Sequence, residues 1–180
     1  MRTTLVAIAL ALAAPAAAQQ AGGATMPESY RDVQLKALQL QRRMLLTIAD
    51  SMPERLYADR AFETQGRDFA HQVHHAATAM AMIGTRIMGA PAAGVPDTSA
   101  ATFTTRAGLK QYVNGIYDWA ESSLKAQTPT SRAEMVSLFG SQMPRWQVWD
   151  ELHTHTVWTA GSMVANFRKH GMAMPGFGFF

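Results

Sequence analysis

Four segments of the chain carry apolar residues at the spacing that places them on one face of an α-helix. They run from about 27 to 50, 66 to 89, 104 to 128 and 144 to 170. The apolar positions are, in order, Val33, Ala37, Leu40, Met44 and Ile48; Phe69, Val73, Ala76, Met80, Ile83 and Ile87; Leu109, Tyr112, Val113, Ile116, Trp119, Ala120 and Leu124; and Trp146, Trp149, Leu152, Val157, Ala160, Met163, Val164 and Phe167. Helices with one apolar face bury it by packing together, so the pattern predicts an all-α four-helix bundle.

The segments between these helices differ in how clearly their sequence predicts a structure. Residues 90–103 hold two prolines and a glycine, which predicts a long loop. A loop of that length crosses the end of a bundle, so the second and third helices need not be adjacent and antiparallel. Residues 130–144 fit either a short extended segment or a helical turn. No segment alternates apolar and polar residues over a useful length, which argues against a sheet.

The chain begins with a pattern typical of an export signal. Arg2 precedes an apolar run, and Ala16-Ala17-Ala18 stands before Gln19. This predicts a signal peptide over 1–18, a flexible leader over 19–26 and a helical domain over 27–180. The apolar run is shorter than the roughly 20 residues that span a bilayer. We therefore expect a periplasmic or secreted protein with no stable membrane insertion after cleavage; a retained anchor is the alternative.

Composition removes several kinds of chemistry. The chain has 16 Lys and Arg residues and 13 Asp and Glu residues, which gives a net charge of +3. The basic residues form no run, so no nucleic-acid partner is expected. The chain has no cysteine, which removes disulfides, thiolate metal sites and cysteine nucleophiles. The remaining residues of chemical interest are 6 His and 12 Met.

Histidines cluster on the second and fourth predicted helices. His71 and His75 are one turn apart and share a helix face. Two imidazoles at that spacing can chelate a divalent ion. His153 or His155 on the fourth helix would add a third nitrogen, as in zinc sites with three histidines and an open position.

A helical wheel separates these histidines. Counted from Phe69 and Trp149, His75 and His155 lie at the edges of their apolar stripes, as at the rim of a pocket. On the same count His153 lies near the core and His74 on the exposed side. The alternative is that these residues are ordinary core and surface histidines.

Short motifs on both helices match one known family. On the second helix they are Arg67-Asp68-Phe69, then His75 and Ala76; on the fourth they are His155 to Gly161, then Phe167-Arg168-Lys169-His170-Gly171 and Pro175. The connection from Met52 to Tyr57 also fits. In these features, over most of residues 27–177, the chain resembles the DinB/YfiT-like proteins.

The resemblance implies a four-helix bundle of DinB-like type, with a long connection between helices two and three. Many members hold a metal, often nickel or zinc, with one histidine of helix two and a His-x-x-x-His pair of helix four. Carried over to this chain, His75 and His155 are ligands, and the second position of the pair is Thr159, a poor ligand. Either His71 supplies the missing nitrogen, or the site binds metal weakly or not at all. Apart from the resemblance, we expect Trp149 and His153 to line a pocket together with Thr159.

The same resemblance implies activities. Some relatives are transferases or isomerases that use cytoplasmic thiols, which does not suit an exported protein. Others are assigned as metal-dependent hydrolases, in which a metal-bound water of lowered pKa is the nucleophile. Asp150 or Glu151 would then act as base, unless both are ordinary first-turn acids that favour the helix dipole.

Two other functions fit parts of the sequence. The chain could be a non-catalytic bundle whose Trp-rich fourth helix binds a small apolar ligand or a partner. Trp158 lies opposite Trp149 on the wheel and should pack against a loop, the apolar tail or a second subunit of a homodimer. The other function is Cu(I) binding through thioethers and imidazole. Its ligands would come from Met80-Ala81-Met82 and from Met172-Ala173-Met174, which lies near His170. The alternative is that these methionines fill the core.

Overall fold

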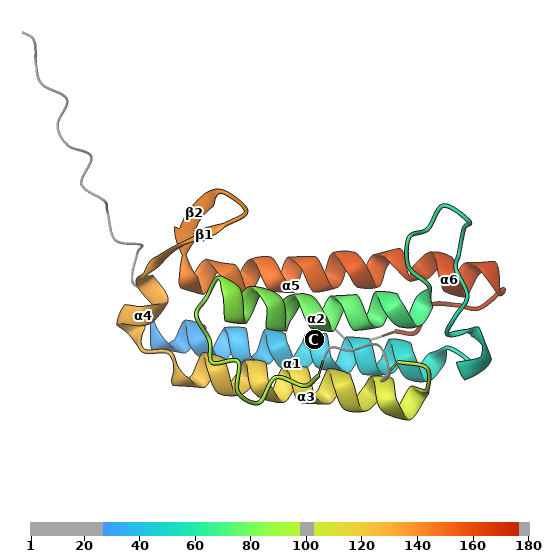
Figure 1. The fold of residues 1–180 in the computed structure, drawn as a ribbon, viewed down its shortest axis with the longest axis horizontal. Coiled ribbons are helices and arrows are strands. Elements are labelled where there is room, and N and C mark those ends of the chain that lie inside the picture. The colour runs from blue at the N-terminus through green and yellow to red at the C-terminus, as the bar shows by residue number, and fades with distance from the viewer. Residues whose placement is uncertain (1–26, 98–102, 177–180) are drawn as a thin grey trace, which may run out of the picture.

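Four long helices dominate the computed structural model, which describes residues 27–97 and 103–176 (Figure 1). They are α1 (Glu28–Ser51), α2 (Phe69–Arg86), α3 (Arg106–Ala126) and α5 (Arg145–Ser162). The shorter elements are the 3₁₀ turn η1 (Glu54–Leu56), the helices α4 (Pro129–Ala133) and α6 (Val164–Lys169), and the strands β1 (Met135–Leu138) and β2 (Ser141–Pro144). The prediction of a mostly helical fold with four main helices is therefore confirmed.

The long helices pack so that α1 and α2 each contact both α3 and α5. Cross-contacts show their directions: α1 runs antiparallel to α3, since Arg42 pairs with Asp118 and Lys110 with Asp50. By contrast α2 and α3 run parallel, because the segment between them returns along the length of the bundle (Figure 1). As predicted, the long connection allows these two helices to lie in an arrangement that is not antiparallel. Residues 98–102 of the connection lie outside the described part of the chain.

Local signals explain where the helices begin. The side chains of Asp68 and Thr105 accept hydrogen bonds from backbone amides three residues on, so each caps the N-terminus of its helix. Thr128 and Ser131 form a reciprocal capping box at the start of α4. The N-cap at Thr105 agrees with the predicted start of the third helix.

The core follows the predicted stripes on α2 and α3 but not everywhere on α1 and α5. Val33 is 56% exposed and Val157 37% exposed, although both were expected to face inward. The neighbouring Gln34 and Thr156 are buried instead. Gln34 can be buried because its amide donates to the Trp146 carbonyl and to Asp150 Oδ1, at 2.7 and 3.0 Å.

A small β-hairpin occupies residues 135–144, so the expectation of no sheet is wrong for this segment. Met135 pairs with Pro144 and Leu138 with Ser141, leaving the two-residue loop Phe139-Gly140. Both loop residues have positive φ, 50° and 90°, as in the type I′ turns that suit two-residue hairpins. Two strands of four residues are too short for an alternating pattern to stand out in the sequence.

The predicted fourth helix is divided in two. A turn at Met163 ends α5, and α6 continues to Lys169. Gly171 follows with φ 66°, the left-handed conformation that terminates helices and that glycine adopts at low cost. The predicted C-terminal boundary therefore agrees with the structure, although the helix is not continuous.

The predicted signal peptide and leader, 1–18 and 19–26, lie outside the described residues. Among the described helices, none has both the length and the hydropathy needed to cross a bilayer.

Candidate functional site

His75 of α2 and His155 of α5 face each other across the interface of these antiparallel helices. Their ring centroids are 5.1 Å apart, with the ring planes at 73°. Both residues are half-buried. Nδ1 of His155 is buried and has no hydrogen-bond partner among the described residues. The structure thus brings together two of the histidines that the sequence singled out.

The surroundings keep this His75–His155 pair neutral. Burial lowers the pKa of His75 below its ordinary value, and the charges of Arg67 and His155 lower it further. Burial, then Arg67, lowers the pKa of His155 in the same way. Neutral imidazole is the form that binds metals, so the pair is in the ligating state at neutral pH.

These pKa shifts predict that acid destabilises the metal-free protein. Above the ordinary histidine value of 6.5, both imidazoles are neutral whether the chain is folded or unfolded. As pH falls through that value the unfolded chain binds protons that the folded chain resists, so the free energy of unfolding decreases. Urea unfolding at about pH 7.5 and about pH 5 should show this loss, and the double variant His75→Ala/His155→Ala should lose less. An equal loss in both proteins would contradict the prediction.

His71 and His74 point to the other side of α2. Nδ1 of His71 is 2.7 Å from Asp68 Oδ1, and its ring packs edge-on against Phe103 at 4.4 Å. His74 stacks on Tyr112, with centroids 4.4 Å apart, so the expectation that it is exposed is wrong. His71 therefore lies beside the start of α3 and is not brought to the His75–His155 pair.

The other predicted pocket residues also lie on α5 but add no ligand to the pair. Thr159 is buried one turn after His155, and Trp149 is a core residue whose indole N–H donates to Gln127 Oε1. His153 is half-buried, and its Nδ1 is buried without a hydrogen-bond partner in the described part of the chain. Within 27–97 and 103–176, no three His, Asp or Glu side chains are arranged to hold one metal ion.

The two acids at the start of α5 have different surroundings. Asp150 accepts hydrogen bonds from the Tyr30 hydroxyl at 2.7 Å and from Gln34. The bond to Asp150, followed by burial, raises the pKa of Tyr30 to about 12. Asp150 thus joins α5 to α1. Glu151 is exposed and lies one turn before His155, so it is the acid that is free to serve this site.

The methionine pairs do not form an evident copper site. Met80 is fully buried while Met82 is 39% exposed, so the two thioethers point to different surroundings. Met172 and Met174 pack against the core. His170 Nε2 is 2.6 Å from Asp59 Oδ2, and Lys169 binds the other oxygen of that carboxylate. This places the imidazole in an ion-pair cluster.

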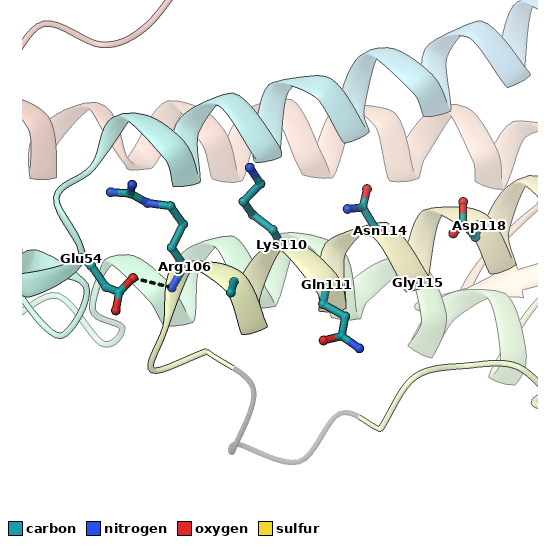
Figure 2. A pocket seen from close by; sticks show the side chains of 8 residues that line it. Glu54, Arg106, Lys110, Gln111, Asn114, Gly115 and Asp118 are labelled. Carbon is teal, nitrogen blue, oxygen red and sulfur yellow. Dashed lines mark hydrogen bonds between the residues drawn. The ribbon is translucent and has the colours of Figure 1, made fainter.

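One surface hollow runs along α3 beside the η1 turn and is lined by Glu54, Arg106, Ala107, Lys110, Gln111, Asn114, Gly115 and Asp118, none of which belongs to α2 or α5 (Figure 2). Arg106 and Lys110 point toward α1, whereas Gln111 points away from it (Figure 2). Lys110 binds both oxygens of Asp50, at 2.8 and 2.7 Å. Because the main charged side chains of this hollow already have partners, we interpret it as a solvated helix surface.

A smaller hollow of about 290 Å³ lies beside His155. It is lined by Ile83, Leu138, Phe139, Glu151, Leu152, Thr154, His155 and Trp158. Trp158 is 81% exposed, so no loop or tail segment within the described residues covers it. Residues 177–180 of the apolar tail, against which it was also expected to pack, lie outside the described residues. Sequence reasoning missed Phe139; the clue was an aromatic residue preceding glycine in a segment short enough to be a hairpin turn.

Comparison with known proteins adds no assignment: no protein-family model, curated protein or solved structure matches the chain.

Proposed function

We propose that this protein binds a divalent metal ion, zinc or nickel, at the His75–His155 pair and uses it to hydrolyse a small substrate. The observation that carries the proposal is the placement of two neutral, half-buried imidazoles with centroids 5.1 Å apart. Two imidazoles bound to one tetrahedral ion at about 2.0–2.1 Å from each nitrogen have ring centres about 5 Å apart. The pair therefore fits such an ion as two of its ligands.

The motif resemblance to DinB/YfiT-like proteins supports the same two ligands. In that pattern the third ligand position is Thr159, so this chain would leave an additional coordination position to solvent or substrate. A bound ion supplies Lewis acidity for hydrolysis of an ester or amide, in which water adds hydroxyl to the carbonyl carbon and its proton leaves with the alcohol or amine. Glu151, one turn before His155, is the carboxylate proposed to move that proton.

Metal titration of the purified domain tests the proposal directly. Zinc and nickel should each bind at about one equivalent per chain, and His75→Ala and His155→Ala should each abolish measurable binding by calorimetry. His71→Ala is the matched control, because its ring is held by Asp68 and Phe103 on the other side of α2; it should bind as the wild type does. Unchanged binding in His75→Ala, or equal loss in His71→Ala, would exclude the pair as the centre.

A further inference from the structure

The hollow beside His155 is walled by the two most exposed aromatic side chains among the described residues. Phe139 at the hairpin tip is 82% exposed and Trp158 of α5 is 81% exposed. The hairpin holds its tip there because Leu138 is buried and both strands contact α5 (Figure 1). Ile83 and Leu152 complete an apolar floor.

The backbone conformation of Phe139 is a second, independent indication that its side chain has a functional role. Its φ of 50° is left-handed, a region that bulky residues rarely adopt. Asn-Gly and Gly-Gly are the usual occupants of such a turn. A phenylalanine here costs stability without burying its ring, and strain of this kind is often found at ligand sites.

Polar groups converge on the same apolar hollow. His155 and Glu151 both line it from successive turns of α5. An apolar concavity with a few converging polar groups is the usual form of a small-molecule site, which occupies roughly 300–1,000 Å³. A hollow of about 290 Å³ suits a compact ligand, about one aromatic ring in size.

We propose that this hollow binds the uncharged aromatic ring of a small substrate between Phe139 and Trp158, with the reacting group directed to His155. Two aromatic side chains that line one hollow favour a planar ring through stacked and edge-to-face contacts. The carboxylate of Glu151 at the wall disfavours an anionic ring. The inference that the bound molecule is a substrate rests on the proposed metal-dependent function. The inference that the hollow binds an aromatic ring does not depend on it.

Titration with 4-nitrobenzyl alcohol, followed by the indole N–H signal of Trp158 in ¹H–¹⁵N NMR spectra, tests the proposal. The signal is assigned with Trp158→Phe. We expect a saturable shift at Trp158 and little at the buried Trp119 and Trp149. Phe139→Asn should weaken binding at least about tenfold while its Tm stays the same or rises, since asparagine suits the turn.

The matched control is Phe62→Asn, which removes another exposed phenylalanine, 63% accessible, that does not line the hollow; it should bind the ring normally. Ring binding unchanged in Phe139→Asn, an unsaturable shift, or a dimer in light scattering that covers Trp158 would each overturn the proposal. Measurements with metal-free protein separate the two proposals. A ring site without a metal site refutes only the proposed function, whereas metal binding without ring binding refutes only this inference.

Discussion

Gly84→Ala lowers the free energy of unfolding by about 1–2 kcal/mol, because an added methyl group has no room between α2 and α3. A Cβ at Gly84 would lie 2.4 Å from Cη2 of Trp119 and 3.1 Å from its Cζ3. The indole cannot move aside freely, since its N–H donates to the Pro91 carbonyl at 2.8 Å and the residue is 6% exposed. This steric cost exceeds the gain of roughly 0.5–1 kcal/mol that alanine has over glycine within a helix.

Gly161→Ala is the matched control for this prediction. Gly161 lies in α5, and a Cβ there meets no described atom within 4 Å. The helix-propensity gain then stands alone and raises stability by about 0.5–1 kcal/mol. Thermal unfolding should separate the two variants by roughly 5–10 °C. If both variants were stabilised alike, the close approach of Gly84 to Trp119 would not exist in solution.

Thr159→His should raise the affinity for zinc and nickel at least about tenfold, or ~1.4 kcal/mol. Residue 159 lies one turn after His155 on α5, so a histidine there forms an i, i+4 pair with it. Such pairs chelate one ion from a single helix face. The variant would convert the two-histidine site into a three-histidine site.

Thr159 is buried, so any larger side chain there carries an overpacking cost of about 1–3 kcal/mol. Thr159→Gln controls for that cost, because it adds comparable bulk without an imidazole. Calorimetric titration of both variants gives the effect as a ratio of affinities. If Thr159→His binds no more tightly than Thr159→Gln, this face of α5 does not hold a metal.

Apolar spacing and helix-capping residues were enough to predict where the four long helices lie, but not the short helix α4 or the division between α5 and α6. Such signals are local: Thr105 caps α3 through a bond to an amide three residues away, and Gly171 ends α6 through its own φ of 66°. The errors arose where a stripe was drawn around apolar residues alone. Gln34 lies in the core instead of Val33 because partners on α5, far along the chain, satisfy its amide.

The candidate site divides in the same way. The sequence by itself placed His75 and His155 at the edges of their stripes, because helical periodicity determines which residues share a face of one helix. Only the tertiary structure decided that His75 meets His155 while His71 turns to Phe103. That choice depends on which helices are neighbours and in what direction they run, and so does the approach of the Phe139 hairpin to Trp158. Such neighbours are set by packing between residues far apart in the chain, which periodicity within one helix does not encode.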